Sequence, residues 1–405
     1  MPREQILGEA ARRRVPQEFI PQDVTVANPP SLFLAVRVLL SRSRNDSSHS
    51  VSHDGGTASA ARQRRQYFLL SATPLLDQWV RWLLATQRVH MRSGTFVGGA
   101  PVGGFQWQGR DPKQDILNPN TMASGLDDYP RASHPSEHDA HVDGLCWLIL
   151  ACQIAQELLA QLDYLHWSTT AGAYLDVGLH SAQGNIQQQV SVICRAKQGH
   201  ATKLVGMAAE QIYKQGPSCP PDFPVPVRPV TDGRGALETR ERWVGEPLKV
   251  QQVERLGYVS IFPLLLRLLP PDSPRLPPLL DLLADPTHLW SEYGLRSLSK
   301  SDPFYLKANN PGDQPYWRGY IWININFLAC AALHHYSKQS GPIQERSADL
   351  YANLRGNILT TVLGEFQRTG YFWEQYDDAT GHGRRGHPFT GWTATVLNII
   401  TEQYE

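Results

Sequence analysis

The stretch Tyr351-Ala-Asn-Leu-Arg-Gly-Asn-Ile-Leu-Thr-Thr-Val-Leu-Gly-Glu-Phe-Gln-Arg-Thr-Gly370 has the periodicity that decides the fold class. Apolar side chains recur in it every three or four positions, namely at Tyr351, Leu354, Ile358, Val362 and Phe366. This spacing gathers them on one face of an α-helix, and a glycine such as Gly370 commonly closes a helix in a left-handed conformation. The stretch therefore predicts a long amphipathic helix that ends at Gly370.

The same period recurs in about nine segments of the chain. Thr73-Pro74 predicts a helix start, with a capping threonine and a proline at the first helical position. The apolar face of that helix comprises Leu76, Trp79, Val80, Leu83 and Leu84. Further helices are predicted over 147–162, 258–269, 320–335 and 392–404, whereas Gln188–Cys194 is the best candidate for a strand. The sequence therefore predicts an all-α fold.

Composition excludes several classes of protein. The 405 residues contain 38 Lys and Arg against 38 Asp and Glu, so the chain lacks the basic surplus expected of a nucleic-acid binder. The mean hydropathy of −0.36 argues against a polytopic membrane protein. With 41% hydrophobic residues the chain can bury a core. The five cysteines form no C-x-x-C pair, so neither a zinc ribbon nor a disulfide framework is indicated.

Two segments interrupt the helical pattern. Ser41–Arg65 is rich in Ser, Arg, His and Gly, which predicts a mobile, disordered insertion. Pro217–Pro229 is rich in proline, which excludes a helix and predicts an extended connector. Because helices of similar character flank both segments, we expect one domain over residues 1–405.

Two loops carry carboxylates in settings suited to chemistry. In Ser124–Arg131, Asp127 and Asp128 are adjacent, and a glycine and a proline keep the stretch out of regular helix. In Thr369–Asp378, Glu374 is surrounded by aromatic residues. Aromatic rings stack on the C–H faces of sugars, and a pair of carboxylates is the minimum machinery for glycoside hydrolysis. One carboxyl must be protonated near neutral pH, and Asp128 beside Asp127 favours that state for Asp127.

Other interpretations of these patterns stay open. Paired aspartates in a loop also occur in solvated turns, and aromatic clusters also occur in cores. His134-Pro-Ser-Glu-His138 matches the H-x-x-E-H pattern of zinc proteases. That chemistry requires both histidines on one helical turn, and Pro135 after the first histidine disfavours this arrangement.

Nine motifs in order carry a family resemblance. They are Arg3-Glu-Gln-Ile-Leu-Gly8, Ala27-Asn-Pro-Pro30, Trp107-x-Gly-Arg-Asp111, Ser124-Gly-Leu-Asp-Asp-Tyr-Pro-Arg-Ala-Ser133, Leu256-Gly-Tyr-Val-Ser260, Tyr293-Gly-Leu-Arg-Ser-Leu-Ser299, Tyr316-Trp-Arg-Gly-Tyr-Ile-Trp-Ile-Asn324, Gly370-Tyr-Phe-Trp-Glu-Gln-Tyr376 and His387-Pro-Phe-Thr-Gly-Trp392. Together they resemble the catalytic domain of processing α-glucosidase I, in glycoside hydrolase family 63.

The resemblance implies an (α/α)6 toroid with aromatic-rich loops at its site. It implies an inverting exo-glucosidase that removes the terminal α-1,2-linked glucose from the N-glycan precursor Glc3Man9GlcNAc2 in the endoplasmic reticulum, without metal or cofactor. Asp127 would be the general acid and Glu374 the general base, with carboxyl groups about 6.5–9.5 Å apart. The substrate contacts implied by the motifs are Arg110, Asp111, Asp128, Tyr316, Trp317, Arg318, Trp373 and Trp392.

Full-length relatives in this resemblance carry a membrane anchor, an N-terminal β-rich domain and a motif that opens the toroid. The present sequence begins after these parts, so we expect a toroid that is incomplete on its N-terminal side. The alternative to an active glucosidase is a chain that binds glycan without hydrolysing it, or that needs a partner to complete the ring.

Overall fold

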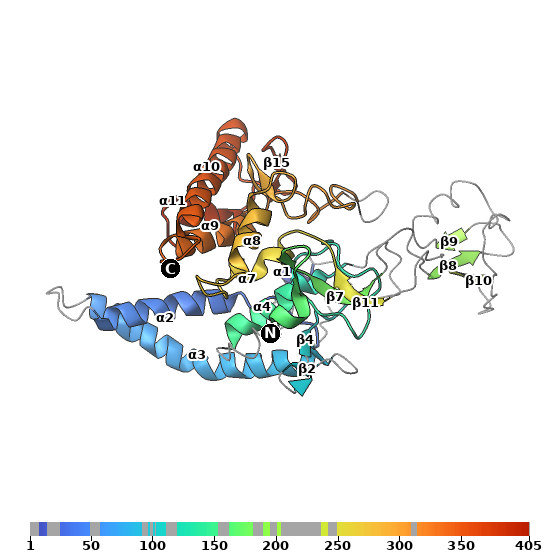
Figure 1. Cartoon of the computed structure of the whole chain (residues 1–405), viewed down its shortest axis with the longest axis horizontal. Coiled ribbons are helices and arrows are strands. Elements are labelled where there is room, and N and C mark those ends of the chain that lie inside the picture. The colour runs from blue at the N-terminus through green and yellow to red at the C-terminus, as the bar shows by residue number, and fades with distance from the viewer. Residues whose placement is uncertain are drawn as a thin grey trace.

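The computed structural model shows a helical body beside a long helical hairpin (Figure 1). In Figure 1 the C-terminal helices pack above the middle of the chain, and α2 and α3 lie side by side at one edge. The structure describes residues 8–13, 25–48, 57–90, 96–97, 100–101, 103–110, 120–152, 162–180, 189–194, 201–203, 236–241, 249–308 and 314–404.

Helix α10 (Gln344–Thr369) confirms the helix predicted from the opening stretch. Gly370 caps it in the left-handed region at φ 78°, and its N–H donates to the carbonyl of Phe366. Leu354, Ile358 and Val362 are fully buried. This helix packs against α9 (Ile323–Ser337), which confirms the helix predicted over 320–335.

The remaining helices are shorter, apart from the hairpin. They are α1 (Gly8–Arg12), α2 (Leu32–Ser48), α3 (Thr57–Gln87), α4 (Val142–Ala151), α7 (Phe262–Leu265), α8 (Leu276–Ala284) and α11 (Val396–Ile400). Three 3-10 turns accompany them: η2 (Met122–Ser124), η3 (Val259–Ile261) and η4 (Trp392–Thr395). One contiguous apolar core contains side chains from helices α3, α4, α7, α8, α9, α10 and α11.

Strands are more numerous than the sequence predicted, but nearly all are short antiparallel pairs. They are β1 (Arg88–His90), β2 (Phe96–Val97), β3 (Ala100–Pro101), β4 (Gly103–Phe105), β5 (Trp167–Ser168), β6 (Ala173–Tyr174), β7 (Asp176–His180), β8 (Gln189–Cys194), β9 (Ala201–Lys203), β10 (Ala236–Glu241), β11 (Lys249–Val253), β12 (Trp290–Ser291), β13 (Gly294–Leu295), β14 (Gln375–Tyr376) and β15 (Gly383–Arg384). The pairs are β1–β4, β2–β3, β5–β6, β7–β11, β12–β13 and β14–β15, and β8 lies between β10 and β9. Strand β8 confirms the strand predicted over Gln188–Cys194.

Several predicted boundaries are wrong. Thr73 does not begin a helix, because α3 already starts at Thr57 and holds Pro74 in its interior. The apolar face after Pro74 is nevertheless correct, since Leu83 is fully buried and Trp79 packs against the core. The predicted 258–269 helix is only η3 followed by α7, and the 392–404 helix only η4 followed by α11.

The segment Ser41–Arg65 is helical where the structure describes it, instead of irregular. Helix α2 continues through 41–48, and α3 covers 57–65. Pairing of two helices supplies the order that the polar composition alone does not predict. The predicted connector Pro217–Pro229 and residues 153–161 of the predicted 147–162 helix lie outside the described residues.

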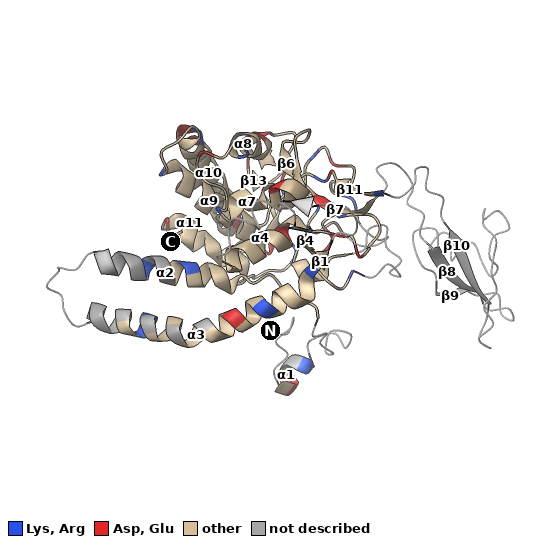
Figure 2. Ribbon diagram, turned by 60° about the horizontal axis from the view of Figure 1, so that its bottom comes forward, with Lys and Arg blue, Asp and Glu red and all other residues tan. Residues whose placement is uncertain are grey.

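Acidic and basic positions both occur on α3 (Figure 2), where the exposed Arg81 pairs with Asp77 at 2.8 Å. No helix within the described ranges is long and apolar enough to cross a membrane. Cys146, Cys152 and Cys330 are buried free thiols, and burial raises the pKa of each.

A buried ion cluster fixes the loop after Asp128 to the helical body. Arg131 is completely buried and contacts Asp143 on α4 at 2.8 Å and Asp176 on β7 at 2.7 Å. Asp176 also accepts a hydrogen bond from the N–H of Val142 at 2.8 Å, at the start of α4. One guanidinium therefore links a loop, a helix and a strand.

Replacing Arg131 with leucine should destabilise the chain by about 3–5 kcal/mol, because two carboxylates would remain buried without their cation. The measurement is the free energy of unfolding in urea at pH 7. Arg346→Leu is the matched control, since Arg346 pairs with Asp281 at 2.6 Å on the surface and should cost less than about 1 kcal/mol. Equal losses in the two variants would contradict the structural role assigned to Arg131.

Candidate active site

The turn after η2 presents Asp127 to a cavity. Gly125 follows η2 in the left-handed region at φ 74°. The hydroxyl of Ser124 donates to the carbonyl of Thr121 and accepts the N–H of Leu126, and the N–H of Thr121 donates to the carbonyl of Asp127. These bonds close the turn on itself and leave the carboxyl group of Asp127 half-buried.

Asp128 serves a different purpose from its neighbour. Its carboxylate accepts the N–H of Trp317 at 2.5 Å and that of Tyr316 at 3.1 Å. Arg318, fully buried, donates through Nε to the carbonyl of Asp128 at 2.8 Å. Burial raises the pKa of Asp128, and the charge of Arg318 opposes that rise. Asp128 thus fastens the loop that carries Tyr316 and Trp317 to the turn that carries Asp127.

Trp322 holds the aromatic residues of the site in place. Its buried ring stacks on Trp317 with centroids 3.6 Å apart and an interplanar angle of 7°. Tyr316 meets the same ring edge-on at 4.6 Å, and Trp392 lies at 5.5 Å. Trp322 Nε1 donates to the carbonyl of Tyr316. Because Trp322 precedes α9, the helix start fixes the position of all three rings.

Glu374 lies just before β14 and is held from three sides. The hydroxyl of Tyr316 donates to its Oε1, and the N–H of Gly386 donates to its Oε2 at 3.0 Å. The indole N–H of Trp392 donates to its backbone carbonyl at 2.7 Å. The side chain is half-buried.

The phenol of Tyr316 contacts Glu374 and lines the same two cavities as Asp127. Burial raises its pKa, as do its hydrogen bond to Glu374 and the negative charges of Glu374 and Asp127. Both carboxylates therefore act on one hydroxyl group, although they are far apart in the sequence.

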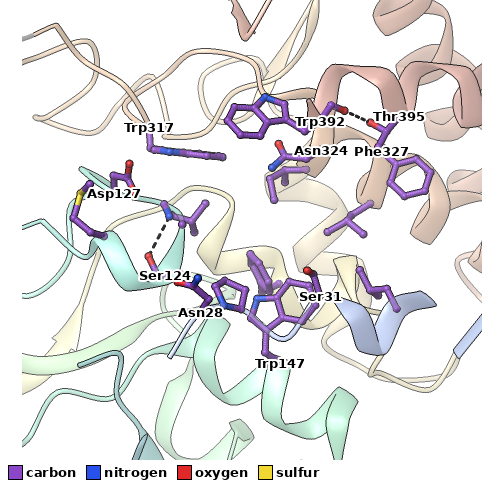
Figure 3. A pocket seen from close by; sticks show the side chains of 18 of the residues that line it. Asn28, Ser31, Ser124, Asp127, Trp147, Trp317, Asn324, Phe327, Trp392 and Thr395 are labelled. Atoms are coloured by element: carbon purple, nitrogen blue, oxygen red, sulfur yellow. Dashed lines mark hydrogen bonds between the residues drawn. The ribbon is translucent and has the colours of Figure 1, made fainter. Parts of the chain in front are cut away.

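A cavity of about 730 Å³ opens beside this group (Figure 3). Asn28, Pro29, Ser31, Leu34, Met122, Ser124, Gly125, Leu126, Asp127, Trp147, Phe262, Tyr316, Trp317, Asn324, Ile325, Phe327, Leu328, Trp392 and Thr395 line it. A smaller cavity of about 200 Å³ is lined by Asn120, Met122, Asp127, Asp128, Gln314, Tyr316 and Arg385. Asp127 and Tyr316 border both cavities.

The structure thus brings together part of the predicted set. Asp127, Tyr316, Trp317 and Trp392 line the large cavity. Glu374 is not among the described residues that line either cavity, and it reaches the site through Tyr316.

Other predicted contacts lie elsewhere. Arg110 is buried and paired with Asp139 at 2.8 Å, and Arg318 is buried behind Asp128, so both support the loops instead of facing the cavity. Trp373 packs against His387, with ring centroids 3.8 Å apart and the rings tilted by 33°. Asp111 lies outside the described residues.

The two histidines of the H-x-x-E-H pattern have other surroundings. His134 contacts the hydroxyl of Ser133 at 2.9 Å and pairs in a bridge with Leu179, whereas the partly exposed His138 lies 3.8 Å from Glu137. Within the described ranges, no group of three or more His, Cys, Asp or Glu residues is placed to hold a metal ion.

Some lining residues were not predicted. Asn324 belongs to a motif that carried the resemblance, so its place in that motif was the available signal. Arg385 stacks over Tyr316 at 4.8 Å with φ 67°, and nothing in its sequence context indicated this.

Comparison with known proteins gives the family. The sequence profile of the "Glycosyl hydrolase family 63 C-terminal domain" matches residues 1–215 and 225–402. The chain belongs to this family. The family 63 chain is 35% identical to a mannosyl-oligosaccharide glucosidase of Arabidopsis thaliana and 33% identical to alpha-glucosidase 2 of the same plant, in each case over 100% of its own length. It is 32% identical to a probable mannosyl-oligosaccharide glucosidase of Schizosaccharomyces pombe, over 99% of its length.

The family 63 chain spans less than half of these relatives, namely 44%, 47% and 45% of their lengths. Among solved structures, it is similar to a family 63 mannosylglycerate hydrolase from Thermus thermophilus in complex with glucose. That match has a TM-score of 0.47 and 17% identity, and it covers 96% of this chain and 78% of the other.

Asp128→Ala should destabilise the chain by roughly 2–5 kcal/mol, because two buried N–H groups lose their acceptor and Arg318 loses its counter-charge. Unfolding in urea measures the loss, and tryptophan fluorescence of the folded variant reports displacement of Trp317. Asp128→Asn, which keeps one acceptor oxygen, should lose less. Unchanged stability in both variants would contradict the role of Asp128 as the anchor of the loop that carries Tyr316 and Trp317.

Glu365 on α10 should make stability depend on pH. Hydrogen bonds from Arg368, from the N–H of Gly383 and from His382 lower the pKa of Glu365 from 4.5 to about 2, although burial opposes them. The ionised form is therefore favoured in the folded chain. Its contribution to stability is complete above pH 4.5 and is lost as the pH falls towards 2.

Glu365→Gln should accordingly be less stable than the wild type at pH 7, and the gap should close towards pH 2. Unfolding free energies measured across this pH range test the expectation. Glu292→Gln, at an exposed position, is the control and should follow the wild-type curve. A constant gap between Glu365→Gln and the wild type at all pH values would refute it.

Proposed function

We propose that this chain is the catalytic part of an α-glucosidase that removes the terminal α-1,2-linked glucose from the N-glycan precursor Glc3Man9GlcNAc2. Family membership and two relatives named as mannosyl-oligosaccharide glucosidases support the substrate class. The same relatives support a place in the lumen of the endoplasmic reticulum, associated with the membrane, where this precursor is processed.

In the proposed mechanism Asp127 is the general acid and Glu374 the general base. Asp127 would protonate the leaving oxygen, while ionised Glu374 would remove a proton from the water that attacks the anomeric carbon. The observation that carries this assignment is geometric, because Asp127 and Tyr316 line the same cavity and the hydroxyl of Tyr316 donates to Glu374. A single displacement of this kind inverts the anomeric configuration, and the carboxyl separation expected for it is about 6.5–9.5 Å.

The aromatic lining supports a sugar as the ligand. Trp317 and Trp392 line a cavity that Asp127 also lines. Pyranose rings place apolar C–H groups on such faces and direct hydroxyl groups to polar side chains. For the whole domain we propose the (α/α)6 toroid of the family resemblance, for which the packed pairs α2–α3 and α9–α10 are consistent elements.

Asp127→Asn and Glu374→Gln should each reduce glucose release by about a hundredfold to ten-thousandfold, because each removes one proton-transfer group. The assay measures glucose released by the purified chain from an oligosaccharide with a terminal α-1,2-linked glucose. Proton NMR of the fresh product should show β-glucose first, as inversion requires.

Asp272→Asn and Glu292→Gln are the matched controls, because they make the same chemical changes at exposed positions and should retain wild-type rates. Wild-type activity in the Asp127 or Glu374 variants would overturn the assignment. A folded wild-type chain that binds the oligosaccharide and releases no glucose would favour the alternative, a glycan-binding chain without catalysis.

A further inference from the structure

One wall of the large cavity is formed by the beginning of α9. Four residues of this helix line the cavity, of which Ile325, Phe327 and Leu328 are apolar and Asn324 is polar. Figure 3 shows the amide of Asn324 below the indole of Trp392. An apolar side chain would cover this wall without desolvating a polar group, so the asparagine needs an explanation.

The side-chain oxygen of Asn324 is buried and has no hydrogen-bond partner in the structure. Buried polar atoms normally have partners, and an unpaired one carries a desolvation cost. Rotation about the Cβ–Cγ bond of an asparagine has a broad energy profile, so the amide can turn either its oxygen or its nitrogen towards the cavity.

Asn326, two positions further along α9, is an asparagine whose side chain is hydrogen-bonded entirely within the chain. Its nitrogen donates to Tyr258 Oη and to the carbonyls of Leu295 and Trp322, and its oxygen accepts the N–H of Leu295. Asn326 is fully buried and its bonding capacity is used within the chain. The side chain of Asn326 is therefore paired within the chain, whereas Asn324, which lines the cavity, has an unpaired side-chain oxygen.

We infer that Asn324 binds one hydroxyl group of the sugar held in the cavity and thereby determines which sugar is accepted. This inference rests on the proposed function, which it extends to a specificity-determining residue. A hydroxyl group both donates and accepts, so it fits either orientation of the amide. A site built to pair with a hydroxyl group discriminates against analogues that lack it, because the protein group is then left unpaired.

The test uses glucose and its 2-, 3-, 4- and 6-deoxy analogues as probes. Binding is measured by the change in tryptophan fluorescence, since Trp147, Trp317 and Trp392 line the cavity. The wild type should bind one of the deoxy sugars about tenfold more weakly than glucose through loss of this bond. Asn324→Leu should bind glucose about tenfold more weakly, and its penalty for that same deoxy sugar should disappear.

Asn398→Leu is the matched control, because it makes the same chemical change at an exposed position. Asn398 is not among the described residues that line the cavity, so its replacement should leave the pattern of deoxy-sugar penalties intact. Circular dichroism establishes that each variant is folded. If Asn324→Leu does not fold, Asn324→Ala removes the amide without adding apolar volume and tests the same pattern.

An unchanged pattern of penalties in a folded Asn324 variant would overturn the inference while glucose release by the wild type stays intact. A wild-type chain that neither binds these sugars nor releases glucose would overturn the proposed function as well. The two failures are therefore distinguishable.

Discussion

The carboxylate of Asp128 is the interaction on which the site depends. It binds the N–H groups of Tyr316 and Trp317, while the backbone carbonyl of the same residue binds Arg318. A segment before α4 is thereby joined to a segment before α9 that lies far away in the sequence. Without these bonds Asp127 would have no fixed position relative to the phenol of Tyr316, which contacts Glu374. Trp317 would also lose the hydrogen bond that fixes its backbone.

The sequence predicted those elements whose cause is local. Helix α10 follows from five apolar positions and a closing glycine, and the carboxylate loops follow from motifs that keep their residues out of helices. The start of α3 could not be predicted in this way, because a proline that favours a helix start when judged alone lies inside a longer helix. Packing between α2 and α3 overrides that local preference.

For the site, sequence alone does not separate residues that face a ligand from residues that hold the loops. Asp128 and Arg318 occur in the same motifs as Asp127 and Tyr316, and Arg110 occurs in another of the nine motifs, yet ion pairs and backbone contacts account for all three. Sequence shows that a polar residue is present, whereas only the fold shows which partners it has. Asn324 and Asn326 show the same limit. They lie on different faces of α9, so one lines the cavity with an unpaired oxygen and the other is hydrogen-bonded in the core.

Pro74 in the interior of α3 has a consequence for how the hairpin holds together. A proline donates no N–H to the carbonyl of Leu70, and its ring crowds that carbonyl. Beyond the proline, Leu83 is anchored in the core, whereas before it Tyr67 and Phe68 are 75% and 52% exposed. The proline removes one hydrogen bond between the two halves of the helix, so we expect the outer half to fray more readily than the half anchored in the core.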